Sequence, residues 1–366
     1  FCAFTFDPEA AKDIDETRWP GVTLLKAQMN TDLLTEDLKK ARASNQSFWL
    51  MGQPDVEVRK RKDGLYEVEV HGFDYFDTVK GELVSGGKSK IAMWLRLLKD
   101  LEDVAGLATS VADMDSLRAQ DRFAVFFGFQ NGSPIEDNLD FLDVFHSLGV
   151  RFIQLTYNAR NFIGSGSGER EDEGLSDFGI AAVQRMNELG IVVDVSHCGY
   201  RTTMDAITHS SKPVAVTHAN MRSLAATPRN KSDEQLEALK RNGGVVGVKH
   251  MIGDMVTKPA AETTVADLVD HLEHAIGIVG LEHVCLGTDF SGTTSAMGTS
   301  DAEIMAIRRR WPNAYLGSRS RPRGFQSIRE LPNLTAELVR RGYSDADIAL
   351  IYGGNLKRFM AEVMGG

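Results

Sequence analysis

The sequence predicts an α/β fold, a (β/α)8 barrel of the TIM type with one inserted β-hairpin. Short apolar runs alternate with longer amphipathic segments along the 366 residues. The runs are too apolar for half-exposed strands, which is typical of parallel strands covered on both faces. Eight such runs fit a closed barrel better than an open doubly wound sheet, and no G-x-G-x-x-G follows an early strand. We therefore expect one barrel domain over residues 1–366.

The eight expected strands are the apolar runs of the chain. They span residues 22–29, 46–52, 122–129, 150–156, 191–196, 213–217, 244–250 and 283–288. Amphipathic segments with helical spacing lie between several of them. One is LSDFGIAAVQRMNELG, and another is WLRLLKDLEDVAGL at 94–107, which we expect to be helical before the third strand.

One segment breaks this alternation. DVEVRKRKDGLYEVEV at residues 55–70 has a period of two around a KDG turn. This pattern predicts a β-hairpin inserted after strand 2, and its polar face predicts an exposed flap. The sequence leaves open whether the flap covers the barrel mouth or mediates self-association.

The amino-acid composition indicates which classes of partner the protein is expected to bind. The formal net charge of -10 and the pI near 5.5 argue against nucleic-acid binding, which needs a concentrated basic face. Three cysteines give no disulfide framework. No apolar run reaches the ~18 residues that span a bilayer, so no transmembrane segment is expected. The compartment is left open.

Polar residues follow most of the expected strands, where barrels of this kind carry their chemistry. Neutral imidazoles on adjacent strands can bind zinc, and a nearby carboxylate can take a proton from water. The pattern therefore favours a metal site, with single structural histidines as the alternative. Four other histidines, at 71, 209, 271 and 274, are expected at the surface. The strand-end residues are Gln28, Asn30, Gln130, Tyr157, His197, His218, His250 and Asp289.

Several blocks in fixed order give the chain a family resemblance. They include FGFQNGSPIEDNLDFLDVFHSLGVRFIQLTYNARN, GLSDFGIAAVQRMNELGIVVDVSHCG, KPVAVTHAN, TPRNKSDEQL and HVCLGTDFSG. With these blocks the sequence resembles the membrane (renal) dipeptidase family, zinc metallopeptidases with an amidohydrolase-like barrel. The resemblance is dense from about residue 120 to 290 and weak before about residue 90.

The resemblance implies roles for particular residues. Members bind two bridged metal ions at the barrel mouth, and the ligands of one ion fall on His197 and His218. The arginine that holds the substrate carboxylate falls on Arg229, with Asn230 beside it in the same substrate-binding block. A guanidinium suits this task because it can donate two parallel hydrogen bonds to a carboxylate. The aspartate that handles the proton falls on Asp289.

Departures from the family pattern lie in the other half of the metal site. The His-x-Asp motif of strand 1 is best placed on Gln28 and Asn30, and the bridging glutamate falls on Gln130. The histidine that contacts substrate falls on Tyr157. Amides carry no charge to offset two adjacent dications, so we expect at most one zinc ion, or none.

Three functions compete at this point. The first is a hydrolase of a dipeptide or small amide with a free carboxylate, which uses at most one metal ion. The second is a repurposed barrel enzyme that acts on a small amino-acid-derived metabolite in a biosynthetic pathway. The third is a catalytically dead binding protein, which the retained His197, His218, Arg229 and Asp289 argue against. Members of the family are often dimeric, so a homodimer is expected.

Overall fold

The computed structural model describes residues 55–60, 66–71, 83–256, 258–289 and 321–365. The first two expected strands, at 22–29 and 46–52, lie outside this part of the chain. The expected ligand positions Gln28 and Asn30 therefore lie outside it as well.

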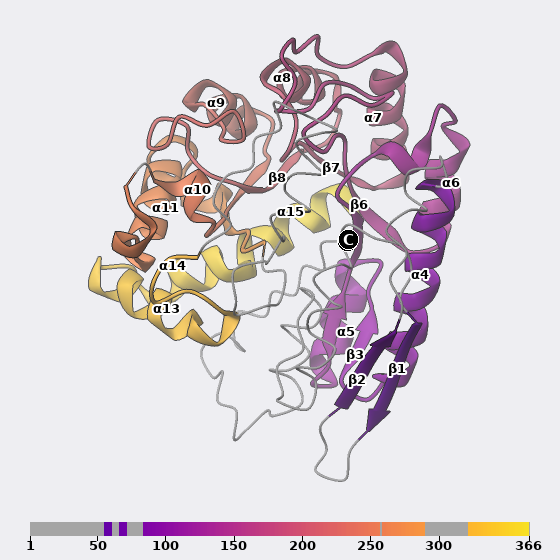
Figure 1. Cartoon of the computed structure of the whole chain (residues 1–366), viewed down its shortest axis with the longest axis horizontal. Coiled ribbons are helices and arrows are strands. Elements are labelled where there is room, and N and C mark those ends of the chain that lie inside the picture. Colours follow the sequence, from indigo (N-terminus) through magenta and orange to yellow (C-terminus); the bar gives the residue numbers. More distant parts are fainter. Residues whose placement is uncertain (1–54, 61–65, 72–82, 257, 290–320, 366) are drawn as a thin grey trace.

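Six parallel strands form the central sheet of the structure (Figure 1). Their order is β10-β9-β8-β7-β6-β5, so strands that follow one another in the chain are neighbours in space. The strands are β5 (Phe127–Phe129), β6 (Val150–Gln154), β7 (Val192–Asp194), β8 (Ala215–Ala219), β9 (Val245–Val248) and β10 (Val284–Leu286).

A second parallel pair continues this arrangement. Strand β4 (Phe123–Val125) pairs with β3 (Ala105–Leu107), and the chain then passes through Phe126 into β5, which pairs with β6. One run, residues 123–129, thus joins β3 on one side to the six-stranded sheet on the other. The predicted α/β class is confirmed. Among the described strands, the barrel is not closed, because β3 and β10 each have one neighbour.

Strand β3 corrects the sequence prediction, which made residues 94–107 helical throughout. Helix α4 (Leu83–Asp100) stops at Asp100, and the AGL segment then pairs in register with Phe123–Val125. A Cβ on Gly106 would lie 2.6 Å from Leu117 Cδ2, so only a glycine fits this position without a shift of Leu117. Long-range pairing to a neighbouring strand here overrides the helical spacing of the local sequence.

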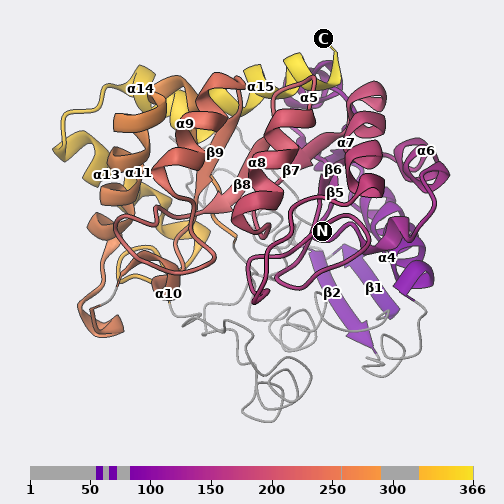
Figure 2. The same cartoon turned by 90° about the horizontal axis from the view of Figure 1, so that it is seen from above.

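Helices lie between consecutive strands, as the alternation predicts. Helices α6, α7, α8, α9 and α11 contact one another in that order, and Figure 2 shows the last four side by side over the sheet. Ser176 caps the start of α7, and Gly190 ends that helix in a left-handed conformation, with φ at 69°. The helices after α4 are α5 (Val111–Ala119), α6 (Asp140–Ser147), α7 (Asp177–Leu189), α8 (Tyr200–His209), α9 (Asp233–Arg241), α10 (Ile252–Met255), α11 (Val265–Val279), α13 (Leu331–Arg340), α14 (Asp345–Ala349) and α15 (Asn355–Met364), with short 3-10 or π segments η3 (Ser133–Ile135), η4 (Ala260–Glu262), η5 (Leu281–His283), η6 (Ile328–Glu330) and η7 (Leu350–Gly354).

Two antiparallel strands lie in the segment where the hairpin is expected. Strand β1 (Asp55–Lys60) pairs with β2 (Tyr66–His71), with Asp55 opposite His71 and Lys60 opposite Tyr66. The two strands form a sheet of their own among the described residues. Figure 1 places them beside α4, and some residues of α4 and β1 are in contact.

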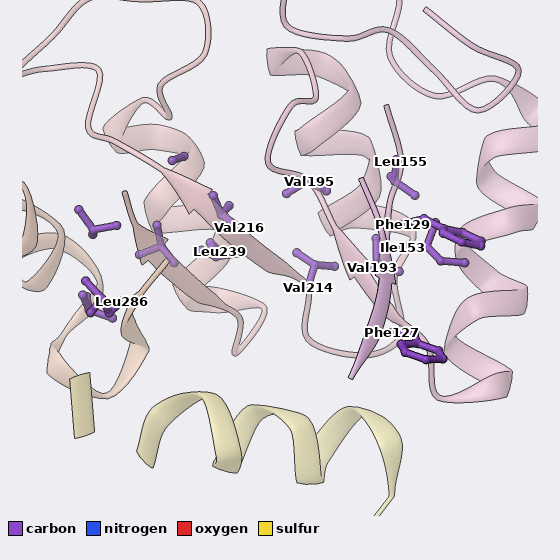
Figure 3. Close-up of a cluster of buried hydrophobic side chains, with 14 of the residues drawn as sticks. Phe127, Phe129, Ile153, Leu155, Val193, Val195, Val214, Val216, Leu239 and Leu286 are labelled. Carbon is purple, nitrogen blue, oxygen red and sulfur yellow. The ribbon is translucent and has the colours of Figure 1, made fainter. Parts of the chain in front are cut away.

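Alternate strand residues enter two different apolar clusters. Ile153, Val193, Val216 and Leu286 belong to the larger cluster, which lies between the strands and the helices (Figure 3). Their neighbours at or near the amino ends of the strands pack with helix α15 and cover that end of the sheet. They are Phe152, Val192, Ala215, Val245 and Cys285, and they contact Leu356, Phe359, Met360 and Val363. The carboxyl ends of the strands are therefore the ends left for chemistry.

None of the helices in the described part of the chain combines the length and apolar character that a membrane span requires.

Candidate metal and substrate site

Two histidines meet at the carboxyl ends of β7 and β8. His197 lies three residues beyond β7, and His218 is the fourth residue of β8. Their side chains point at each other, with 3.1 Å between the two Nε2 atoms. Both residues are buried, at 7% and 1% exposure. The structure thus brings together the two residues that the sequence proposed as ligands of one ion.

Close approach of the strands fixes the backbone beside this pair. A Cβ on Gly247 would lie 2.1 Å from the Thr217 carbonyl oxygen, and one on Gly287 would lie 2.0 Å from the same oxygen. Only glycine permits this contact, so the GVVGV and CLG segments bring β9 and β10 close to the residue before His218.

Each histidine uses its other ring nitrogen in a hydrogen bond. His197 Nδ1 lies 2.8 Å from Asn158 Oδ1, and His218 Nδ1 lies 2.8 Å from Thr217 Oγ1. Burial, and next the positive charge of Arg229, hold the pKa of both imidazoles well below the usual value. Both rings are therefore neutral at neutral pH, the form that binds a metal ion.

Arg229 lies beside this pair in the loop between β8 and α9. Its side chain is 3% exposed, and Nη2 donates to the carbonyl oxygen of His218 at 2.6 Å. Nε and Nη1 have no hydrogen-bond partner among the described residues. The alternative pairing with Asp233 is not found, because that carboxylate accepts from Ser223 and contacts His274. Two buried donors thus remain for a ligand.

Neighbouring residues hold the loop that carries Arg229. Asn230 Nδ2 donates to the carbonyl oxygens of Ala225 and Asp254, both at 2.7 Å. Lys231 is 1% exposed and donates through Nζ to Cys198 O at 3.1 Å and to Thr203 Oγ1 at 2.9 Å. Burial lowers the pKa of Lys231 to about 8. The amide of Asn230 therefore fixes the loop, and its contact with substrate stays a prediction.

A buried ion pair that the sequence did not predict lies after β9. Lys249 Nζ is 2.5 Å from Asp254 Oδ2, and the two side chains are 4% and 7% exposed. Burial lowers the pKa of Lys249, while the charges of Asp254 and then Asp289 act in the opposite direction. Asp289, just after β10, is thus near enough to Lys249 for the two charges to interact. Its backbone has a φ of 52°, which is unusual for a residue other than glycine.

Tyr157 and Gln130 follow β6 and β5. The Tyr157 ring stacks on His197 with centroids 4.2 Å apart and an interplanar angle of 24°, and it remains 37% exposed. Gln130 accepts a hydrogen bond from Gln154 Nε2 through its backbone oxygen. Tyr157 is therefore in direct contact with the histidine pair, and Gln130 follows the neighbouring strand.

The expectation that His271 lies at the surface is wrong. It is 1% exposed in α11, accepts from the Met221 backbone N–H through Nδ1 at 3.0 Å, and donates to Met255 O at 2.6 Å. It lies three residues after the buried Leu268 and four before the buried Ala275, so it shares the buried face of α11, where the loop around Met221 and helix α10 supply its hydrogen-bond partners. His274 is half-buried against Asp233, and His209 is exposed.

The histidine pair offers two ligands to one metal ion among the described residues. Two zinc ligands at ~2.0–2.1 Å in tetrahedral geometry are separated by roughly 3.3 Å, close to the 3.1 Å between the imidazole nitrogens. Among the described residues, no group of three or more histidine, cysteine, aspartate or glutamate side chains could hold an ion. The bridge position, Gln130, carries a neutral amide. The two histidines suit one ion that completes its shell with ligands from elsewhere.

Comparison with known proteins identifies the family. The model of the membrane dipeptidase family, peptidase family M19, matches residues 65–306 and 312–365. The chain belongs to this family. The membership confirms the resemblance noted in the sequence, and it makes the chain a relative of metallopeptidases.

Two known proteins are each 32% identical to the chain over the matched residues. An uncharacterized dipeptidase of Schizosaccharomyces pombe is 32% identical over 231 residues, which are 62% of this chain and 49% of that protein. An amidohydrolase from Pseudomonas aeruginosa is 32% identical, with a TM-score of 0.66 over 76% of this chain and 84% of that one. The chain spans about half the length of the yeast relative.

A further solved structure shares the fold. It is a metallopeptidase from Rhodobacter sphaeroides that holds a phosphinate mimic of the dipeptide L-Ala-D-Ala. It is 22% identical, with a TM-score of 0.65 over 75% of this chain and 73% of that chain. Together with the amidohydrolase, it confirms the α/β fold.

Proposed function

We propose that this protein is a metal-dependent hydrolase of a dipeptide or small amide with a free carboxylate. One metal ion, most suitably zinc, would be held by His197 and His218. The observation that carries this proposal is the pair of neutral imidazoles whose Nε2 atoms face each other at 3.1 Å. Membership of a metallopeptidase family supports the same reaction class.

Arg229 binds the substrate carboxylate in this proposal. Its guanidinium is fixed by one hydrogen bond to the His218 backbone and retains two buried donors, Nε and Nη1. A carboxylate that accepts from both would satisfy them and would gain two charge-assisted hydrogen bonds. The hydrogen bond from Nη2 to the His218 carbonyl oxygen holds Arg229 next to the proposed metal position. A substrate carboxylate bound to Arg229 would therefore bring the neighbouring amide bond close to the metal ion.

Asp289 takes the proton from the attacking water. Its charge interacts with that of Lys249, and a carboxylate is a group that can act as a general base. A divalent ion bound to the two histidines would act as a Lewis acid and make the water more acidic. The buried ion pair with Asp254 holds the Lys249 ammonium in place.

Gln130 favours a second candidate function. The resemblance places a bridging carboxylate at this position, and a neutral amide there disfavours the reaction of a two-metal peptidase. Tyr157, an exposed aromatic ring stacked on His197, also changes the surface that a substrate meets. These two departures favour a repurposed enzyme that acts on a small amino-acid-derived metabolite and keeps Arg229 for recognition. The homodimer expected from the family stays a prediction.

Elemental analysis and a hydrolysis assay on the purified protein test these proposals together. We expect close to one zinc ion per chain and hydrolysis of a carboxylate-bearing amide that a chelator abolishes. The variants His197→Ala and His218→Ala should lose both the zinc and the activity, while His209→Ala, at an exposed position, should lose neither. Two ions per chain would refute the single-ion site. Zinc-free protein with no hydrolytic activity would leave the repurposed enzyme as the better explanation.

A further inference from the structure

The protons around Asp194 determine which nitrogen of His218 carries hydrogen. Asp194 is 4% exposed and accepts from the backbone N–H groups of Ser196 and Thr217, at 2.9 and 3.1 Å. The hydroxyls of the same two residues also donate to it, at 2.6 and 2.5 Å. A hydroxyl has one proton to give. With Asp194 in its carboxylate form, which four donors surround, Thr217 Oγ1 gives its proton to Asp194 and accepts from His218, so the hydrogen lies on His218 Nδ1.

Asn158 determines which ring nitrogen of His197 carries hydrogen. Its Oδ1 lies 2.8 Å from His197 Nδ1 and also accepts from Ser167 Oγ at 3.2 Å. An amide oxygen cannot donate, so the hydrogen lies on His197 Nδ1.

The backbone around Asn158 holds this acceptor in place. The φ angle of Asn158 is 59°, a left-handed conformation that asparagine tolerates better than most residues. Its carbonyl oxygen accepts from Gly168 N at 2.8 Å, and a Cβ on Gly166 would lie 2.2 Å from its carbonyl carbon. The Ser167 N–H in turn donates to His197 O at 2.8 Å. Asn158 and His197 are thus held in place by backbone hydrogen bonds to the same segment, residues 167–168.

Both Nε2 atoms then carry lone pairs, and these face each other at 3.1 Å. Two acceptors at this distance repel unless a cation lies between them. We propose that Asn158 and the Asp194–Thr217 pair are positioning residues that hold both histidines as Nδ1–H tautomers, so that the two Nε2 atoms are set to bind one divalent ion. The inference rests on the proposed metal-dependent function and adds to it the residues that prepare the ligands. Partners of this kind orient metal-binding imidazoles and raise their affinity.

Two matched pairs of variants test it by zinc affinity, measured in competition with a chromophoric chelator. Thr217→Val and Ser196→Ala each remove one hydroxyl that donates to Asp194, but only the first removes the acceptor of His218 Nδ1. We expect Thr217→Val to weaken zinc binding about 10- to 100-fold, Ser196→Ala to change it much less, and Thr217→Ser to retain it. Equal losses in Thr217→Val and Ser196→Ala would overturn the inference.

The second pair addresses His197. Asn158→Gly removes the acceptor and keeps a residue suited to a positive φ, whereas Ser167→Ala removes only the other donor to Asn158 Oδ1. We expect about a 10- to 100-fold loss of zinc affinity in Asn158→Gly alone. Unchanged affinity in that variant, with its fold intact by circular dichroism, would contradict the role of Asn158.

Nitrogen-15 NMR of the metal-free protein, labelled at histidine, reads the tautomers directly. The inference requires a protonated Nδ1 on both His197 and His218, and a hydrogen on Nε2 with Nδ1 bare would overturn it. This readout separates the inference from the proposed function. Wild-type protein that binds no zinc would refute the metal-dependent hydrolase, while the tautomers would still decide whether these residues set the two rings.

Discussion

Replacing Arg229 with methionine separates ligand binding from folding. Methionine has a similar length and no charge. The change removes the two donors, Nε and Nη1, that have no partner among the described residues. If both donate to a ligand carboxylate, each bond contributes ~1.5–3 kcal/mol. Their loss then weakens binding by ~3–6 kcal/mol, which corresponds to ~10²–10⁴-fold in Kd.

The same change should alter the free energy of unfolding much less. The variant loses the hydrogen bond from Nη2 to His218 O, which contributes ~1.5–3 kcal/mol as a bond from a charged donor. It also removes two buried donors without partners, each of which costs ~1–3 kcal/mol in the free protein. The second effect, ~2–6 kcal/mol for the two donors together, opposes the first and is at least as large, so we expect no large fall in Tm.

Calorimetric titration with two ligands tests this reasoning. One is a phosphinate dipeptide analogue with a free carboxylate, and the other is the same molecule with a carboxamide. Wild-type protein should prefer the carboxylate, and Arg229→Met should bind the two with similar affinity. The control is Arg222→Met, an exposed arginine of the same loop, which should keep the preference. Equal losses for both ligands, or a large fall in Tm with unchanged affinity, would refute a carboxylate-binding role.

Three further predictions concern other parts of the chain. Gln130→Glu alone should not produce efficient hydrolysis of alanyl-alanine, because Gln28 and Asn30, where we expect the strand-1 ligands, stay amides; strong hydrolysis in that single variant would show that the account of the first metal position is wrong. Burial lowers the pKa of His271, so the unfolded chain binds a proton near pH 6.5 that the folded chain does not, and stability falls as the pH drops below that value. Between pH 7.5 and 5.5 this costs up to about 1.4 kcal/mol, and urea unfolding at both pH values should show the difference reduced in His271→Gln but not in the exposed His209→Gln. Gly166→Ala places a methyl 2.2 Å from the Asn158 carbonyl carbon and should lower stability by ~1–3 kcal/mol, whereas Gly277→Ala in α11, with nothing within 4 Å, should be neutral or stabilising; equal thermal melts for the two would argue against a tight turn at Asn158.

The sequence by itself determined the fold class and predicted that the two candidate metal ligands lie together. Apolar runs such as residues 191–196 and 213–217 are too apolar for half-exposed strands, so they require a parallel sheet covered by helices. The carboxyl ends of parallel strands lie at one edge of a sheet, which brings His197 and His218 together without any knowledge of the side-chain geometry. The observed 3.1 Å between their Nε2 atoms agrees with that placement.

Only the tertiary structure decided which polar residues support the site. Asp194 lies inside an apolar run, and its neighbours in the sequence do not indicate that it supports the site. Thr217, whose hydroxyl donates to it, is 23 positions away. Asn158 and His197 are separated by 39 positions, and His271 receives its hydrogen bond from Met221, 50 positions away. Hydrophobic periodicity is a local property of the chain, so sequence can reveal it. The pairing of buried polar groups depends on which distant segments the fold brings into contact, and every such group must find its partner there.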